Sequence, residues 1–370
     1  MDFNSIPGIE LHLHAEGAIP REYLWERRVA EDPTLTRAEF ESEFNYSDFK
    51  DFVKLWCKYQ NLLFSIPQTY SNYERATARG LHPAPIEILP VLAQSLRQHN
   101  LSYVELHISP IDACYMTYGK QILDSADFYT SIVKAWQVAC DQWNTLEGES
   151  LTIKLILDLV RNYPQNILDF QMHNLRNIRA ELTELVAVGL GGGDDSKSLL
   201  DFNEAFREVR ALDLGLVVHA GEHLPKATAS REISEAISLK VDRIGHGIHG
   251  YADHLEKLQE SQIALEICPT SNLVTGSVNK MVEHPLMDML NAGINCVIGS
   301  DDPTYFETNF WDEMQIAVDM FVQKGFLEDL SEIQCNNSLV IKLLKNSIDA
   351  SYASAELKNK LKSKLDLGSD

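Results

Sequence analysis

The sequence predicts an α/β fold, a (β/α)8 barrel of the TIM type, with a helical insertion after the first strand and a helical C-terminal tail. Three observations support this fold class. Eight short runs are almost continuously apolar, which is typical of parallel strands covered on both faces. Amphipathic segments separate these runs, as in successive βα units. Four polar motifs follow the C-terminal ends of the runs, where barrels of this type carry their sites.

The predicted strands are rich in Val, Ile and Leu. The sixth run is weak by itself and is placed in the barrel by its regular spacing. The eight predicted strands are Ile9–His14, Tyr103–Ile108, Ile153–Leu159, Leu185–Gly189, Leu216–His219, Arg243–Gly245, Ile263–Ile267 and Cys296–Ser300.

The segments between the later strands have the spacing of amphipathic helices. An open, doubly wound sheet is the alternative fold. It is disfavoured because no Gly-rich dinucleotide fingerprint follows the first strand, and because sites at both the first and the last strand suit a closed ring. The predicted helices between strands are Asn166–Glu181, Leu199–Ala211, Ala229–Ser238, His254–Gln259 and His284–Asn291.

Residues 15–102 separate the first two predicted strands and are too many for a plain βα connection. Phe49–Phe64 and Ile86–His99 have helical patterns, so we expect a helical insert over about 15–100. Insertions after barrel strands lie over the active-site mouth, which predicts a lid and pocket wall. A packing extension without substrate contact is the alternative. The whole chain, 1–370, is predicted to be a single domain, with tail helices at Asn309–Gln323, Leu330–Ser347 and Ser354–Lys364.

Composition narrows the functional class. With 45% hydrophobic residues, the chain can bury a substantial core. A formal charge of -22 argues against nucleic acid, which is bound by clustered Lys and Arg. The six cysteines show no close pairing, and no apolar stretch approaches the length of a membrane span. We therefore expect a cytoplasmic protein with no membrane partner; the sequence leaves its oligomeric state open.

Three histidines and an aspartate are the candidate metal ligands. His12 and His14 project from the same face of the first strand, because strand side chains alternate. Two surface histidines are the alternative, which the apolar context disfavours. His219 ends the fifth strand, and Asp301 ends the eighth, which neighbours the first in a closed barrel. Three neutral imidazoles and one carboxylate suit one Zn²⁺ per chain, although other divalent ions fit the same set.

Further polar residues could supply acid–base chemistry. Glu222 comes three residues after His219, and Gly221 allows the chain to turn so that Glu222 points over the mouth. A glutamate in a dry pocket keeps its proton more readily and can act as a general acid. A helix-start glutamate is the alternative. His246, flanked by glycines, could orient or activate water, or be a satisfied core histidine. Asp302 cannot face the same way as Asp301 in a regular strand and could turn to the substrate.

The ordered motifs HxH, a Gly-rich loop, HAGE, RIGHG, CPTSN and SDDP resemble the adenosine deaminase family of metal-dependent barrels. The resemblance runs from about residue 9 to the Asn346-Ser347 region. Each motif is weak singly, but their joint order and spacing are specific. The resemblance assigns the zinc-ligand roles to His12, His14, His219 and Asp301.

The same resemblance implies roles around a purine. Glu222 matches the acid that protonates purine N1, and His246 matches the group that orients and deprotonates the attacking water. Asp302 matches the acceptor at N7, and Gly193 matches the backbone donor to N3. Glu16 stands where the family has Asp or Glu, near the sugar or the space it would occupy.

Three positions depart from the family pattern. His107 stands where the family commonly has Arg after the second strand's Val-Glu. The Gly-rich loop ends in Asp194-Asp195 where Asp-Glu is usual, and His223 follows HAGE where a small residue is commoner. These departures leave the metal ligands intact and affect the shape of the pocket, and therefore the substrate.

The resemblance implies hydrolytic deamination of adenosine, and of deoxyadenosine, to inosine and ammonia. Adenine, a modified adenosine or its nucleotide is the alternative substrate, since Glu16 in place of Asp takes up ribose space; the lack of a phosphate cradle weighs against a nucleotide. A third hypothesis is a nucleoside-binding protein that has lost catalysis. The absence of a metal-ligand residue or of Glu222 would favour it, but the sequence has all of these residues. Cytidine-type deaminases are excluded because no HxE with a paired PCxxC occurs. The partner is therefore a small purine nucleoside or base.

Overall fold

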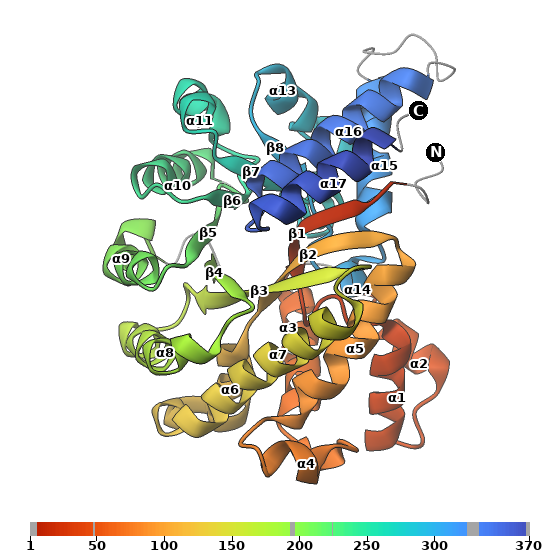
Figure 1. Ribbon diagram of the computed structural model, residues 1–370, viewed down its shortest axis with the longest axis vertical. Helices are drawn as coiled ribbons and strands as arrows, with labels where there is room; N and C mark the ends of the chain where they lie inside the picture. Colours follow the sequence, from red (N-terminus) through yellow and green to blue (C-terminus); the bar gives the residue numbers. More distant parts are fainter. Residues whose placement is uncertain (1–5, 47–48, 193–196, 224, 324–332, 368–370) are drawn as a thin grey trace.

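The computed structural model describes residues 6–46, 49–192, 197–223, 225–323 and 333–367. Eight parallel strands form one sheet in the order β1 to β8, and Figure 1 shows them in the middle of the molecule with helices around them. The predicted barrel is confirmed. The strands are β1 Gly8–His14, β2 Leu101–Ile108, β3 Thr152–Val160, β4 Leu185–Gly191, β5 Gly215–Ala220, β6 Arg243–His246, β7 Ala264–Ile267 and β8 Cys296–Ile298.

The ring closes between β1 and the residues that follow β8. The backbone N–H of Asp301 donates to the carbonyl of His12 at 3.0 Å, and the N–H of His14 donates to the carbonyl of Asp301 at 2.9 Å. Leu13 and Asp301 form a parallel bridge. Barrel closure therefore places the candidate ligands of the first and last strands side by side.

Each helix predicted between the later strands is present within a few residues. The helices after β2 were not predicted from the sequence, although Trp136, Cys140 and Trp143 of α7 are buried at helical spacing. The helices that follow β2 to β8 are α6 Pro110–Tyr118, α7 Ala126–Glu147, α8 Gln165–Ile178, α9 Asn203–Ala211, α10 Lys226–Ser238, α11 Leu255–Ser261, α12 Pro269–Val274, α13 Leu286–Asn291 and α14 Pro303–Phe306.

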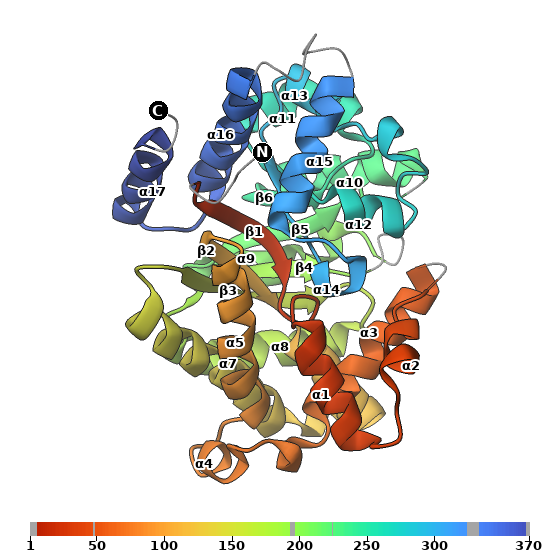
Figure 2. The same cartoon turned by 90° about the vertical axis from the view of Figure 1, so that its right-hand side faces the viewer.

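The insertion between β1 and β2 is helical, as predicted, and Figure 2 shows it gathered on one side of the strands. The second predicted helix begins earlier, at Pro83, because the His82 side chain accepts from the N–H of Ala84 and Pro suits the first helical turn. The insertion consists of α1 Arg21–Glu31, α2 Arg37–Ser42, α3 Phe49–Phe64, α4 Tyr73–Thr77 and α5 Pro83–Gln98.

The C-terminal tail is also helical. Its second helix was predicted to begin at Leu330, which lies outside the described residues; the described helix packs on β8 and β1. The tail helices are α15 Phe310–Gln323, α16 Ile333–Ala350 and α17 Ala355–Leu367.

A buried ionic network crosses the barrel interior below the site. Arg243 is fully buried, bonds to Glu266 and lies 2.6 Å from Glu105 Oε2. Tyr103 donates its hydroxyl to Glu105 at 2.8 Å. The other oxygen of Glu266 lies 2.7 Å from His12 Nδ1. The network links the charge of Arg243 to the orientation of His12.

Replacing Arg243 by Met should lower the free energy of unfolding by about 3–5 kcal/mol, because two buried carboxylates lose their cation. Chemical denaturation measures the change. Lys134→Met is the control, since its pair with Glu181 is largely solvent-exposed and should be worth about 0–1 kcal/mol. Equal stability of the Arg243→Met and wild-type proteins would show that the network does not support the barrel.

Candidate metal centre and substrate pocket

The four predicted metal ligands lie together at the mouth of the barrel. His12 Nε2 is 3.7 Å and His14 Nε2 is 3.4 Å from the same oxygen of Asp301. The ring of His219 lies 4.8 Å from that of His12, centroid to centroid. Nitrogens of the three histidines lie within 4.8 Å of one another. The three histidines therefore form one group, and Asp301 lies against two of them.

Two residues of the site have left-handed backbone conformations that non-glycine residues rarely adopt. Asp301 has a φ of 61° and His246 a φ of 62°. Such conformations cost free energy and concentrate at functional sites. At Asp301 the conformation ends the regular strand, so Asp301 faces the imidazoles while both Asp301 and Asp302 line the cavity above them.

Each candidate histidine ligand has a polar partner at its other nitrogen. His12 Nδ1 faces Glu266 at 2.7 Å, and His219 Nδ1 faces the Leu190 carbonyl at 3.2 Å. His14 Nδ1 lies 3.5 Å from Asp158. Such partners fix the tautomer and the ring orientation of metal-binding histidines. Nε2 of each ring is left to face the centre.

These supporting acids are not among the site residues predicted from the sequence. Glu266 is the one charged residue of β7, and Asp158 follows an apolar run in β3. Buried carboxylates in such strands were a usable signal that their side chains face the barrel interior. His107, the departure from the family pattern, is fully buried and lies 2.8 Å from Asp158. It shares this carboxylate with His14.

The electrostatics of the cluster suit a cation. Burial lowers the pKa of His219, and the neighbouring histidines lower it further, so this ring stays neutral. Burial opposes ionisation of Glu266, but the charges of Arg243 and His12 lower its pKa to about 2. Burial lowers the pKa of His12, yet its interactions with the carboxylates of Asp301 and Glu266 outweigh burial and raise the pKa above its usual range. Acids that draw a proton onto His12 attract a cation to the same point.

The donor set fits a divalent metal. His12 Nε2 is buried and has no hydrogen-bond partner in the described part of the chain, although it faces the centre of the cluster. An unpaired buried polar atom is costly unless something binds it. Three imidazole nitrogens with one carboxylate oxygen match the ligands that Zn²⁺ takes in hydrolytic sites.

Glu222 and His246 face the same centre. His246 Nε2 lies 3.6 Å from Glu222 and 3.8 Å from Asp301. The amide nitrogen of Asn272 lies 3.1 Å from His246 Nδ1, and its oxygen lies 3.2 Å from His284 Nε2. Burial lowers the pKa of His246 to about 3, so the ring is neutral.

A cavity of about 360 Å³ opens above the cluster, within the range of small-molecule sites. One stripe of α3 forms its wall, with Phe49, Phe52, Val53 and Trp56. The insertion therefore forms a pocket wall, as predicted; its action as a lid stays a prediction. Asp302, also predicted to face the substrate, lines the cavity and has a buried oxygen, Oδ1, without a hydrogen-bond partner among the described residues.

The remaining predicted residues are placed differently. Glu16 is buried and accepts from the backbone N–H of Ser109 at 3.1 Å, but it is not among the described residues that line the cavity. Gly193 lies outside the described residues, as do Asp194 and Asp195. His223 lines the cavity, and its ring lies 5.5 Å from that of Phe49.

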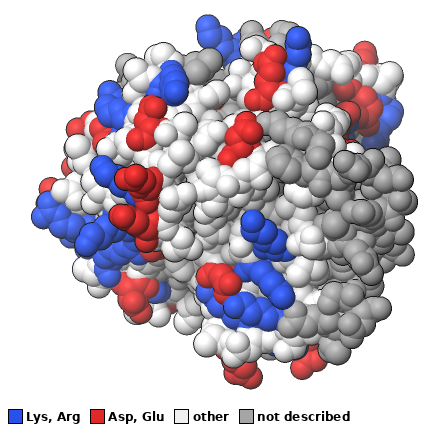
Figure 3. Space-filling model, turned by 90° about the horizontal axis from the view of Figure 1, so that it is seen from above, with Lys and Arg blue, Asp and Glu red and all other residues white. Residues whose placement is uncertain are grey.

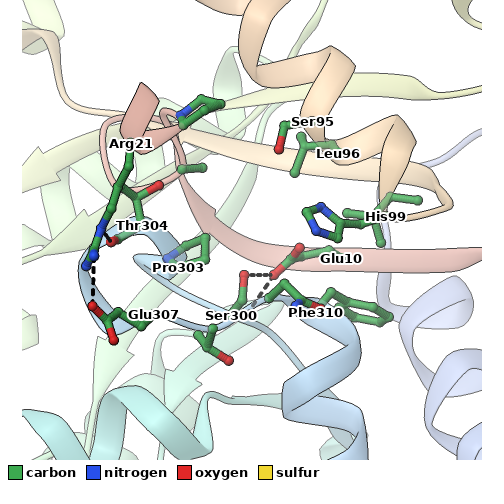
Figure 4. Close-up of a pocket in the computed structure, with 15 residues that line it drawn as sticks. Glu10, Arg21, Ser95, Leu96, His99, Ser300, Pro303, Thr304, Glu307 and Phe310 are labelled. Carbon is green, nitrogen blue, oxygen red and sulfur yellow. Dashed lines mark hydrogen bonds and ion pairs between the residues drawn. The ribbon is translucent and has the colours of Figure 1, made fainter. Parts of the chain in front are cut away.

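A second cavity of about 360 Å³ lies behind the segment that carries Asp301 and Asp302 (Figure 4). Glu10 lines it and accepts from the N–H and the hydroxyl of Ser300 at 2.7 and 2.6 Å. Figure 4 also shows Arg21 paired with Glu307 across the same segment. None of the candidate metal ligands among the described residues lines this second cavity. The residues of the second cavity instead anchor the segment that carries Asp301 and Asp302.

Charged side chains of both signs are scattered over one face of the molecule (Figure 3). Figure 3 shows Lys and Arg interspersed with Asp and Glu on the face that it draws. No helix in the described ranges is both long enough and apolar enough to cross a bilayer.

The chain is thus a TIM-type barrel of eight parallel strands with a His/Asp cluster at its mouth. Residues 7–367 match the family model described as Adenosine deaminase, and the chain belongs to that family. It is therefore a metal-dependent hydrolytic deaminase of aminopurine compounds.

Named relatives in sequence differ in their substrates. The chain is 27% identical to an aminodeoxyfutalosine deaminase of Acidothermus cellulolyticus, over 88% of this chain and 86% of the relative. It is 25% identical to an adenine deaminase of Paraburkholderia phytofirmans, over 97% of this chain and 92% of the relative. Both alignments span nearly the whole chain.

Solved structures share the fold. An adenine deaminase from Arthrobacter aurescens has a TM-score of 0.74 at 22% identity, covering 98% of each chain. Arabidopsis ADAL complexed with GMP has a TM-score of 0.75 at 21% identity, covering 100% of this chain and 99% of the other. An amidohydrolase from Burkholderia ambifaria with bound Zn has a TM-score of 0.74 at 19% identity, covering 100% and 93%.

Replacing Glu266 by Gln should weaken Zn²⁺ binding by roughly 10–100-fold, because His12 loses the carboxylate that orients it. Competition with a chromogenic chelator measures the dissociation constant. Glu313→Gln is the matched control, since Glu313 is equally buried but accepts from Thr270 and Thr308. An unchanged affinity in Glu266→Gln, or an equal loss in both variants, would contradict the orienting role.

Proposed function

We propose that the protein hydrolyses the 6-amino group of adenine, or of adenine substituted at N9, with one Zn²⁺ held by His12, His14, His219 and Asp301. The observation that carries the proposal is the buried, unpartnered Nε2 of His12 at the centre of a His/Asp cluster, with Glu222 and Asp302 on the cavity above it. Water adds to C6 and ammonia leaves, so adenine would give hypoxanthine.

The names of the relatives favour this wider substrate class over adenosine alone. The sequence relatives reported above are named for adenine and for aminodeoxyfutalosine. Adenosine, the substrate expected first from the sequence, is therefore one member of the proposed class. The alternative substrate, adenine or a modified aminopurine, is now favoured over adenosine.

The protein's own residues divide the proton transfers. Glu222 would donate a proton to ring N1 as C6 becomes tetrahedral, which a general acid within reach of the ring can do. Asp302, which lines the cavity, would accept a hydrogen bond from the purine. A bound Zn²⁺ supplies Lewis-acid activation of water.

His246 is held for an orienting role. The Asn272 amide donates toward Nδ1, so the proton of the neutral ring belongs on Nε2, which points to Glu222 and Asp301. In this tautomer His246 donates a hydrogen bond to an oxygen at the centre. It accepts a proton there only after the ring proton has moved.

Replacing Glu222 by Gln should lower kcat by at least roughly 100-fold, because the amide keeps the shape but has no acidic proton. Ammonia release from the best 6-aminopurine substrate measures the rate. Metal analysis of the same sample should still find about one Zn²⁺ per chain.

Glu260→Gln is the control, since Glu260 is an exposed glutamate on α11. Near-normal turnover in Glu222→Gln would remove Glu222 from the proposed role. Failure of the zinc-loaded wild type to release ammonia from any 6-aminopurine would overturn the proposed function itself.

A further inference from the structure

His223 lines the cavity beside the proposed general acid. It is the residue that departs from the family pattern after HAGE, and it lines the cavity together with Glu222. Its Nε2 atom lies 3.4 Å from Oε2 of Glu222. The side chain of His223 is 27% exposed, and its ring lies 5.5 Å from that of Phe49. The proposed acid therefore has an imidazole neighbour in addition to His246.

Two imidazoles face the same oxygen of Glu222. His246 Nε2 lies 3.6 Å from Oε2, and His223 Nε2 lies 3.4 Å from it. The Asn272 amide fixes the tautomer of His246, so that its Nε2 carries the proton. Contacts between catalytic groups are often long without substrate and shorten in the complex. Oε2 is therefore placed to accept hydrogen bonds, and an acidic proton is favoured on Oε1.

The loop after α12 holds His223 from its other nitrogen. Nδ1 of His223 lies 2.9 Å from the Ser277 hydroxyl, whose oxygen is 3.1 Å from that of Thr275. Ser277 is buried, and its carbonyl lies 2.8 Å from Nε2 of His249. A buried polar network whose members are satisfied is rigid. When the Ser277 hydroxyl donates to Nδ1, the proton of the His223 ring is on Nε2 and faces Glu222.

The same loop supports both imidazoles. Asn272 of α12 holds the ring of His246, and its carbonyl accepts from the N–H of Val278 at 2.9 Å. Ser277, the residue before Val278, holds the ring of His223. Residues 272–278 thus orient the two rings that face Oε2.

We propose that His223 is a positioning residue for Glu222: its Nε2–H holds Oε2, so that the acidic proton is carried on Oε1 and delivered from there to the purine. The inference rests on the proposed function, in which Glu222 is the general acid at ring N1. The Oε1 proton passes to N1, and the electron pair of that O–H bond stays on Glu222. Of the two protons of the added water, one leaves with ammonia and the other restores the acid.

The hydrogen bond from His223 is worth more during the reaction than before it. Glu222 is uncharged before it gives up its proton and carries a negative charge afterwards. A hydrogen bond to a charged acceptor is roughly twice as strong as one to a neutral acceptor. An interaction that strengthens as the transition state forms raises kcat and leaves substrate binding nearly unchanged. His223 should therefore act on kcat rather than on KM.

The test measures ammonia release from adenine and from adenosine by zinc-loaded full-length variants. His223→Leu keeps an apolar contact with Phe49 and should lower kcat for the better substrate by roughly 10–100-fold, the worth of a hydrogen bond to a charged group, with KM nearly unchanged. His223→Gln should recover most of this loss, because its amide N–H can reach Oε2. His254→Leu is the control, since His254 is half-buried, lies 2.8 Å from the Ser230 carbonyl and is not among the described residues that line the cavity.

A double-mutant cycle separates positioning from packing. Glu222→Gln removes the acidic proton, so adding His223→Leu to it should lower kcat by little more. Two independent losses would multiply instead. Metal analysis should find the same zinc content in every variant, because His223 is not one of the proposed ligands.

The outcomes distinguish the positioning role from the proposed function. An unchanged kcat in His223→Leu, an equal loss in His254→Leu, a loss in KM instead of kcat, a loss that multiplies with that of Glu222→Gln, or a His223→Gln variant no better than His223→Leu would overturn the positioning role and leave the proposed function standing. No ammonia from the zinc-loaded wild type with any 6-aminopurine would overturn the proposed function, and the positioning role with it.

Discussion

The pairing of β1 with the residues after β8 is the constraint on which the rest of the site depends. The backbone of Asp301 bonds to His12 and His14, which are separated from it by most of the chain. The same hydrogen bonds that close the barrel bring a carboxylate against two imidazoles, so closure of the barrel is required for the candidate ligands to meet. Glu10 holds Ser300 beside this seam and fixes the segment that carries the aspartates.

Charged side chains buried in the barrel interior need partners of opposite charge. Arg243 is placed between Glu105 and Glu266, and Glu266 in turn holds His12. Buried charges of this kind are tolerated only when they are paired and hydrogen-bonded. The chain of contacts passes from the bottom of the barrel to its mouth, so a residue with no access to substrate controls the direction in which a candidate ligand points. The pocket above is walled by an aromatic stripe of α3, and Glu222 and Asp302 are among its polar lining residues.

The eight strands could be predicted because buried parallel strands are continuously apolar and end in polar motifs. The four candidate ligands followed from their places at strand ends. The supporting acids could not be paired in advance, since the partner of His12 lies on β7, far away in sequence, and only the closed ring shows which strands are opposed. The placement of Glu16 shows the same limit: a resemblance supplies a role near the sugar, whereas its actual partner, Ser109, depends on how β2 ends.

The central claim is that barrel closure assembles one metal centre from the first, fifth and eighth strands. Anomalous diffraction from a zinc-loaded crystal, recorded on both sides of the zinc absorption edge, tests it most directly. The account predicts a single strong peak within coordination distance, about 2.0–2.2 Å, of Nε2 of His12, His14 and His219 and of an Asp301 oxygen. A peak elsewhere in the chain, or a peak that touches fewer than three of these four side chains, would contradict it.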